Sequence, residues 1–252
     1  MLPASWKPAA VGELVRLGGP NDGGYVVAEP VLATTTTLLS LGLADDWSFE
    51  RDFRARSGAR VICVDGTVHR RFWIEHFLVN LSRRRLRRAF RFAAYRRFFA
   101  NPRAEHRRLM VGYDGPQSVS LDTMMRELEG ESVFLKCDIE GAEYRVLDHI
   151  VAHAGRLTGI AMELHAVDLH RDRISAFLAA LPDFRIAHLH GNNFGGTDTH
   201  GDPLVIEISL VRADLLPGSP RSCAIDSTPN RPDLPDLTIR FAGGGDAARD
   251  CG

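Results

Sequence analysis

The stretch VFLKCDIEGAEYRVL, residues 133–147, contains the pattern that decides the fold. It begins with an apolar run of strand length, and a turn at Gly141 leads into a helix expected over 142–154. The same pattern recurs, with further strands expected at 37–43, 60–65, 158–164, 185–189 and 204–211 and helices at 47–57, 70–81, 121–129 and 171–181. This alternation predicts an α/β fold with a mostly parallel sheet and helices on both faces. Only a loop joins the last two strands, so the terminal strand is expected to be antiparallel.

The composition is that of a globular protein. The chain has 252 residues, 44% hydrophobic and 25% charged, with a mean hydropathy of -0.12. It has no apolar run near the roughly 18 residues that cross a bilayer and no basic leader with an apolar region, so neither a transmembrane segment nor a secretory signal is expected. The four cysteines form no CxxC pair, which excludes a zinc ribbon and favours a reducing cytoplasm over a disulfide scaffold.

Two predicted strand ends suggest a nucleoside site, because open α/β sheets bind ligands outside the carboxyl ends of their strands. The first strand runs into SLGLADD (residues 40–46), where Gly42 permits a tight turn before Asp45. The second ends at Asp65, where a carboxylate can accept both hydroxyls of a ribose. We assign these three residues, together with Asp138 at the end of the strand at 133–137, to cofactor binding. The alternative is an ordinary loop, since SLGLADD is not GxGxxG.

Three acids crowd the turn after the strand at 133–137, namely Asp138, Glu140 and Glu143. A carboxylate there can orient a sulfonium cofactor, bind a metal or take a proton from a hydroxyl. The alternative is capping of the following helix, whose dipole favours acids in its first turn. Capping accounts for Glu143 and Glu140, whereas Asp138 still belongs to the strand.

The motif LKCDIEGAEYRVL (135–147) resembles the FkbM-like class I S-adenosylmethionine-dependent methyltransferases. The resemblance extends to GGPNDGGYVV (18–27), SLGLADDWSFE (40–50), SVSLDTMM (118–125) and HLHGNN (188–193), and so spans about residues 16–211. One departure is that the family's D-x-G-x-x-x-G motif is reduced to Gly42 with two aspartates. The resemblance implies a Rossmann-like sheet with a final antiparallel strand, S-adenosylmethionine as cofactor, and O-methylation of sugars, glycans or other secondary metabolites.

Later strand ends add candidate catalytic groups. MELHAVD (162–168) presents Glu163 and His165 on one side, and HLHGNN presents His188 and His190 on one face. We assign catalysis to His165 or His190 as general base with Asp138 or Glu163 as orienter. The alternatives are structural histidines, or a divalent-metal site that would combine the four catalytic candidates with Asn192. No metal is assigned.

The segment DGGYVV (22–27) is expected either to gate the cofactor, with Tyr25 covering a ring or sugar, or to form a β-turn before an edge strand. The residues assigned to acceptor binding are Asp22, Tyr25, Glu140, Asn192 and Asn193.

Residues 82–108 hold eleven arginines and one acid, Glu105, which leaves twenty basic and thirty-one acidic residues elsewhere. Apolar residues recur every four positions from Leu86 to Phe98, which predicts a basic amphipathic helical insertion of about four turns. It is either an ordinary packed helix or a docking element for an anionic membrane surface or a phosphorylated or lipid-linked acceptor. Nucleic acid is not expected, because no RNA-binding motif accompanies it.

We therefore expect a class I methyltransferase domain at 1–214 with an insertion at 82–108, and a Pro/Gly-rich tail at 215–252 that is extended or partly disordered, with one short strand at 237–241. The predicted function is cytoplasmic or membrane-peripheral O-methylation of a small-molecule or glycan acceptor. Alternatives are RNA or protein methylation with docking through the basic helix, and a catalytically silent fold that binds a membrane or a partner. No oligomeric state is assigned.

Overall fold

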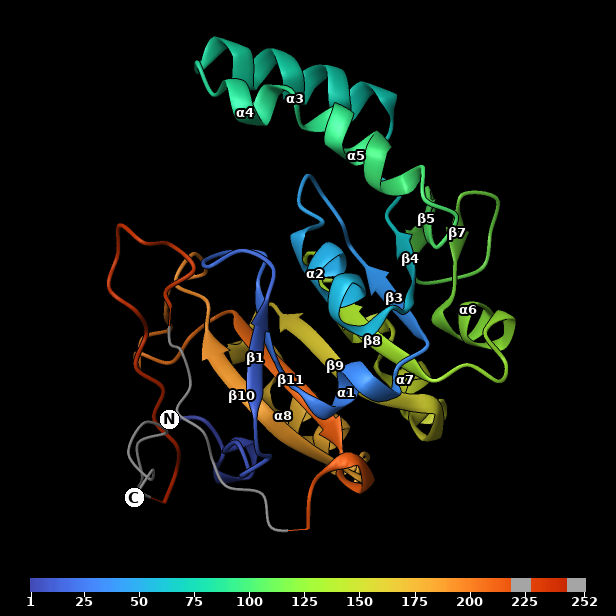
Figure 1. The fold of residues 1–252 in the computed structure, drawn as a ribbon. Helices are drawn as coiled ribbons and strands as arrows, with labels where there is room; N and C mark the ends of the chain where they lie inside the picture. The colour runs from blue at the N-terminus through green and yellow to red at the C-terminus, as the bar shows by residue number, and fades with distance from the viewer. Residues whose placement is uncertain (219–227, 244–252) are drawn as a thin grey trace.

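A computed structural model describes residues 1–218 and 228–243 of the chain. Its centre is a seven-stranded sheet in the order β10-β11-β9-β8-β3-β4-β5 (Figure 1). The strands are β3 (Thr37–Leu41), β4 (Arg60–Val64), β5 (Ala104–Arg107), β8 (Val133–Cys137), β9 (Leu157–Leu164), β10 (Phe184–Gly191) and β11 (Ile206–Arg212). The pairs from β9 to β5 are parallel, and β11 is antiparallel to both of its neighbours. The predicted mostly parallel sheet with a terminal antiparallel strand is confirmed.

The strand order places the ligand-binding edge of the sheet. Counted along the chain, the sheet strands lie in the order 3-2-1-4-5-7-6, which is the Rossmann order 3-2-1-4-5-6 with a seventh strand inserted before the sixth. The chain reverses direction across the sheet between β3 and β8. In such sheets the crevice outside the carboxyl ends at this reversal holds the ligand.

Helices cover both faces of the sheet, which explains why its strands are almost continuously apolar. One face, which includes Leu39 and Leu135, packs on α6 (Leu121–Glu127), α7 (Leu147–Ala152) and α8 (Val167–Ala179). The other face, which includes Leu38 and Phe134, packs on α1 (Pro30–Thr34) and α2 (Ser48–Ser57). Neighbouring leucines of β3 therefore point to opposite cores, as the two-residue period of a strand requires.

Local sequence signals mark several element ends. Ser120 caps α6 by accepting a hydrogen bond from the Thr123 N–H (3.1 Å). Gly58 ends α2 in the left-handed conformation, with φ of 71°. The remaining short elements are the antiparallel pair β1 (Leu14–Leu17) and β2 (Tyr25–Ala28), the parallel pair β6 (Met110–Val111) and β7 (Ser118–Val119), and 3-10 turns at Ala4–Trp6, Glu143–Arg145, Ala154–Arg156 and Ala213–Leu215. The helix expected over 142–154 is thus α7 flanked by two of these turns.

Residues 70–99 form a helical hairpin that stands away from the sheet at the top of Figure 1, and we call it the arm. It consists of α3 (Arg70–Ser82), α4 (Leu86–Ala89) and α5 (Arg91–Phe99). The predicted insertion at 82–108 differs from this in two respects. The single basic helix is broken at Phe90, and the predicted segment ends in β5, which is the edge strand of the sheet.

The predicted apolar face, which Phe92, Tyr95 and Phe99 were expected to flank, is buried only in part. Leu86 and Phe90 of the predicted apolar face are exposed, whereas Ala89 and Tyr95 are buried. The ring of Tyr95 packs on Trp73 and Trp47, with ring centroids 4.9 and 6.0 Å apart. Contacts with distant aromatic residues therefore decide which side of the arm is buried. These residues lie outside 82–108, so the spacing of apolar residues within that segment could not reveal them.

The predicted tail is partly described. Residues 228–243 contain no helix, and the strand expected at 237–241 is reduced to a bridge between Phe241 and Leu2. Ile239 and Phe241 are nonetheless buried in the core beside the sheet. Residues 219–227 and 244–252 lie outside the described residues. Among the helices that the structure describes, none is long and apolar enough to cross a membrane.

Candidate functional site

A cavity of about 800 Å³ opens at the carboxyl edge of the sheet, where β3, β4, β8 and β9 end. Its lining includes most of the residues that the sequence predicted for a site: Asp22, Gly42, Asp45, Asp65, Asp138, Glu140, Glu163, His165 and Asn192. With Asp46, seven carboxylates line it, against Lys136 and His165 as the cationic groups. The cavity is therefore strongly acidic.

Gly42 allows β3 and β8 to approach each other beneath this cavity. It has φ of 85°, and a Cβ at this position would lie 1.6 Å from the backbone oxygen of Asp138. Its N–H donates to the Val64 oxygen of β4 (3.0 Å). Neither the conformation nor the space admits another residue at this position. Gly42, which remains from the D-x-G-x-x-x-G motif, is therefore required by the close approach of the two strands.

Asp65, at the end of β4, holds the turn that follows β3. Its Oδ2 accepts the N–H groups of Leu43 (2.9 Å) and Ala44 (3.0 Å), and its Oδ1 accepts the N–H and hydroxyl of Thr67 (2.7 and 2.6 Å). Burial alone would raise the pKa of Asp65, but these hydrogen bonds outweigh it and lower the pKa. A carboxylate has about four acceptor positions, so a ribose there would share oxygens that already support the turn.

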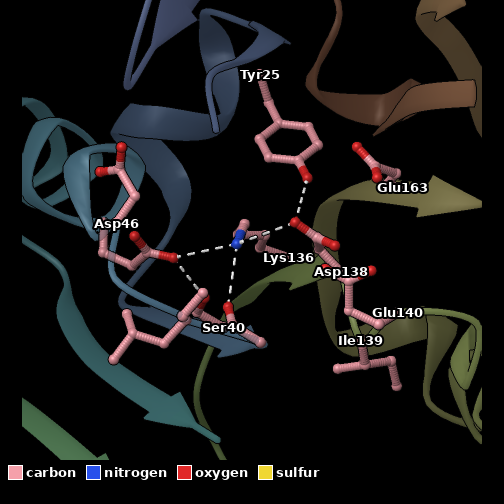
Figure 2. A network of polar contacts seen from close by, with 12 residues as sticks. Tyr25, Ser40, Asp46, Lys136, Asp138, Ile139, Glu140 and Glu163 are labelled. Atoms are coloured by element: carbon pink, nitrogen blue, oxygen red, sulfur yellow. Dashed lines mark hydrogen bonds and ion pairs between the residues drawn. The ribbon is translucent and has the colours of Figure 1, made fainter. Parts of the chain in front are cut away.

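Lys136 is a central residue of the site that the sequence analysis did not select. Its side chain is buried in β8, and its Nζ donates to the Gly42 oxygen (3.1 Å) and lies 3.6 Å from Glu50 Oε1 and 3.9 Å from Asp138 Oδ2 (Figure 2). Burial alone would lower the pKa of Lys136, but Glu50 and Asp138 outweigh it and raise the pKa. The sequence feature that could have identified Lys136 is a lysine within an otherwise apolar strand. Such a buried cation needs an anionic partner nearby.

Two further groups complete this network below the cavity. The fully buried Glu50 of α2 accepts the Ser40 hydroxyl (2.6 Å), and burial raises its pKa. Tyr25 donates its hydroxyl to Asp138 Oδ2 (3.0 Å), and its ring lies 5.6 Å from the Lys136 ammonium. Asp138 is therefore fixed between a phenol and an ammonium group, with a quarter of its side chain exposed toward the cavity.

Asp45 connects the cavity rim to the arm. Its Oδ2 accepts from Arg91 Nη1 (2.9 Å) and lies 3.0 Å from His76 Nε2, while Arg91 also pairs with Asp46 (3.2 Å). Burial alone would raise the pKa of Asp45, but Arg91 and His76 outweigh it and lower the pKa. The carboxylate predicted to bind a cofactor is thus already paired with the arm.

Glu163 and His165, from the end of β9, line the cavity together. His165 Nε2 lies 3.2 Å from Glu163 Oε1 and 3.6 Å from Glu140 Oε2, and its Nδ1 lies 3.3 Å from Glu143. Hydrogen bonding to Glu143, and then to Glu163, raises the pKa of His165 to about 10. The neighbouring carboxylates thus favour its imidazolium form, which donates hydrogen bonds.

The pKa of Glu163 is raised to about 7, chiefly by burial and further by the charges of Asp138 and Glu207, although His165 opposes the shift. Asn192 donates to its Oε2 (3.0 Å). Glu163 is therefore half protonated near neutral pH, which suits a group that exchanges protons at that pH.

Glu143 stabilises the loop that precedes its own 3-10 turn, and it does not cap α7. Its Oε1 accepts the N–H groups of Ile139 (2.8 Å) and Gly141 (3.2 Å), and the residue is fully buried. Glu140, in contrast, extends from the turn with its side chain 89% exposed.

Three predicted site residues do not line the cavity. Tyr25 is buried beneath it, edge-on to Phe49, in the strand that was the alternative to a gating loop. His190 pairs through Nε2 with Asp236 Oδ1 (2.9 Å), and Asn193 bonds Arg231 in both directions. Residues 228–243 thus occupy the polar groups at the end of β10. His190 and Asn193 bond this segment and Tyr25 bonds Asp138, so we do not carry these three side chains into the proposed site.

One cluster could hold a divalent metal. Carboxylate oxygens of Asp22, Glu163 and Glu207 all lie within 4.8 Å of one another. An all-carboxylate set suits Mg²⁺ or Mn²⁺. Of the ligands considered from the sequence, only Glu163 belongs to this cluster. Glu207 was missed because it lies within β11 and approaches β9 only through sheet pairing.

Comparisons with known proteins give structural likenesses only. No protein-family model matches the sequence, and no curated protein matches it. Similar solved structures include precorrin-6y C5,15-methyltransferase from Geobacter metallireducens (10% identity, 72% of this chain and 84% of that one, TM-score 0.39). Others are the Methanococcus jannaschii fibrillarin pre-rRNA processing protein (9%, 72% and 68%, 0.39) and an rRNA methylase from Streptococcus thermophilus (11%, 73% and 92%, 0.40). TM-scores this low do not identify the activity of this chain.

Proposed function

We propose that this protein is an S-adenosylmethionine-dependent methyltransferase that methylates a hydroxyl group of a small acceptor. The observation that carries the proposal is the charge of the cavity, which seven carboxylates line at the ligand-binding edge of a Rossmann-like sheet. A dinucleotide would bring its pyrophosphate against these carboxylates. A sulfonium nucleoside carries a positive charge and is attracted by them.

The residues present fit such a cofactor. A cavity of about 800 Å³ lies within the usual size range of small-molecule sites. The turn of Gly42, held by Asp65, would support the nucleoside, while Asp138 at the end of β8 would face the positive charge. S-adenosylmethionine, when bound, supplies an activated methyl group, so the main task of this chain is to hold an acceptor oxygen in line with it.

Glu163 is the proposed general base. Its pKa of about 7 lets it take the proton of an acceptor hydroxyl at neutral pH, and its carboxylate lines the cavity. Asn192 fixes its orientation by donating to Oε2. We prefer it to the predicted histidine base because the carboxylates around His165 raise its pKa and His190 does not line the cavity. His165 then acts as a positioning residue that keeps its neighbouring carboxylates in place.

The acceptor is proposed to be a sugar, a glycan or another hydroxylated metabolite, as the family resemblance implies. Asp22, Glu140 and Asn192 line the cavity and can accept or donate hydrogen bonds to hydroxyl groups. The acidic lining disfavours an acceptor whose phosphates lie close to the reacting oxygen.

Methyl transfer from labelled S-adenosylmethionine to a panel of sugars, glycans and nucleotide-sugars tests this function. With an accepted substrate, kcat of the natural protein should rise with pH through about 7, because Glu163 must lose its proton. Glu163→Gln should lower kcat by about 10²-fold and abolish this pH dependence. Glu129→Gln removes an exposed carboxylate elsewhere and should change neither. Near-normal turnover of Glu163→Gln would refute the assigned base, and no transfer to any hydroxylated acceptor would contradict the proposed reaction.

A further inference from the structure

The arm carries a feature that the proposed activity does not use, namely exposed apolar side chains. Seven of the thirteen large hydrophobic side chains exposed among the described residues lie between positions 74 and 92. They are Ile74, Leu78, Val79, Leu81, Leu86, Phe90 and Phe92, each with 43% to 62% of its surface exposed. An apolar concentration of this kind on a monomer marks an interaction surface.

The exposed apolar side chains follow both helices of the hairpin. Ile74, Leu78 and Leu81 are spaced by four and three residues, so they form one stripe along α3. Phe90, between α4 and α5, lies against Phe77 of α3, with ring centroids 5.7 Å apart. Trp73 and Phe92 make a similar contact at 5.5 Å. The aromatic contacts hold the two sides of the hairpin together and leave the outer apolar surface to solvent.

The same hairpin is strongly basic at its free end. Residues 70–99 contain ten arginines and a single acid, Glu75, which pairs with Arg71 (2.6 Å). Arg84, Arg85 and Arg88, together with Leu86, line an open hollow where α3 turns into α4. Within the described part of the chain, these three arginines and the exposed Arg83 make no ion pair. Their like charges repel one another, and a bound external anion would offset this repulsion.

We infer that the arm docks on the surface of an anionic phospholipid bilayer. An interfacial helix combines an apolar surface, which enters the acyl boundary, with basic residues that meet the lipid headgroups. The arm has both on one element, and guanidinium groups pair with phosphate through two parallel hydrogen bonds. An acidic protein partner would explain the arginines and leave the leucines in water, so the combination favours lipid.

Co-sedimentation of the full chain with vesicles tests this inference. The protein should bind phosphatidylcholine vesicles that contain about 30% phosphatidylglycerol, and it should not bind phosphatidylcholine alone. Raising the salt from about 0.05 M to about 0.5 M should weaken the binding steeply, since it screens the charges. Equal binding to both kinds of vesicle, or no binding to the anionic ones at low salt, would overturn the inference.

Two sets of variants distinguish the contribution of the arm to vesicle binding from the effect of the overall net charge. Arg83→Gln, Arg84→Gln, Arg85→Gln and Arg88→Gln combined should weaken binding at least about tenfold. The matched control, with Arg56, Arg126, Arg185 and Arg240 each replaced by Gln, removes the same charge from exposed positions elsewhere and should change binding less than about twofold. All these side chains are exposed, so thermal unfolding should be unchanged. An equal loss in both variants would show that overall charge, and not the arm, is responsible.

The apolar component needs its own variant. Leu78→Gln with Leu86→Gln keeps every charge and should also weaken vesicle binding about tenfold at low salt. Unchanged binding would mean that the arm attracts anions without inserting, and would overturn docking on a bilayer. A short single-stranded RNA that binds the arm more tightly than the anionic vesicles, and displaces them, would likewise replace the lipid by nucleic acid.

Discussion

The cavity and the arm carry opposite charges, and they differ in whether the chain itself supplies partners for those charges. At the cavity, the chain itself supplies partners: Asp65 accepts four hydrogen bonds, and Lys136 lies between Glu50 and Asp138. On the arm, Arg83 and its neighbours extend into solvent without a described counter-charge. This difference fits the two proposals, a ligand that enters a preformed site at the cavity and an anionic surface that meets the arm.

Two side chains of the arm, Arg91 and His76, contact the cavity rim, and His76 Nε2 lies 3.0 Å from Asp45 Oδ2. Arg91 of the arm pairs with both Asp45 and Asp46 at the cavity rim. This is the one arginine of α4 and α5 for which the described residues show an ion pair with a carboxylate. The comparison can therefore be tested on each region separately, with Arg91 left intact.

The largest expected effect lies beneath the cavity. Lys136→Met should lower the free energy of unfolding by about 3–5 kcal/mol, because it leaves the fully buried Glu50 and the partly buried Asp138 without their cation. Lys7→Met, which changes an exposed lysine, should have almost no effect. Urea unfolding measures both. If Lys136→Met were as stable as the natural protein, the carboxylates would not depend on an internal partner and the contrast with the arm would fail.

The next effect concerns the turn above β3. Asp65→Ala should weaken binding of S-adenosylhomocysteine by about 1.5–3 kcal/mol, as expected for lost hydrogen bonds to a charged group. Asp148→Ala removes an exposed aspartate from α7 and serves as the control. Calorimetric titration of both variants gives the difference. Unchanged affinity in a folded Asp65→Ala protein would remove this residue from the cofactor site.

The smallest effect concerns residues 228–243. Glu207 and Asp236 raise the pKa of His190 although burial opposes them. A raised pKa means that this pairing stabilises the fold fully below about pH 6.5 and that the contribution is lost as the pH rises through the pKa of the folded state. Asp236→Asn should therefore cost about 1–2 kcal/mol at pH 6 and less at pH 9. Equal losses at both values in thermal unfolding would show that charge on His190 is not involved.

All strands of the sheet except the edge strand β5 could be predicted from the sequence, because their signals are local. Apolar runs mark the strands, and Asp65, Asp138 and Glu163 were found because each follows or ends a strand whose carboxyl end lies at one edge. The residues that were missed have their partners far along the chain. Glu50 meets Lys136 only because β3 pairs with β8, and nothing near either residue specifies that pairing.

The contacts of His190 and of the arm were missed for the same physical reason. His190 ends a strand as expected, but Asp236 contacts it from 46 residues further on. In the arm, the four-residue spacing from Leu86 to Phe98 correctly indicated helix. It did not identify the buried face, because Trp47 and Trp73, outside that segment, pack on Tyr95 instead. Periodicity predicts the type of element, and distant contacts decide what it buries.

The central claim is that an acidic cavity in a Rossmann-like sheet holds a sulfonium nucleoside and not a dinucleotide. Calorimetric titration of the full chain with S-adenosylmethionine, S-adenosylhomocysteine and NAD tests it most directly. One molecule of either S-adenosyl compound should bind per chain, the two should compete, and NAD should not bind. Binding of NAD, or failure of a folded protein to bind either S-adenosyl compound, would contradict it.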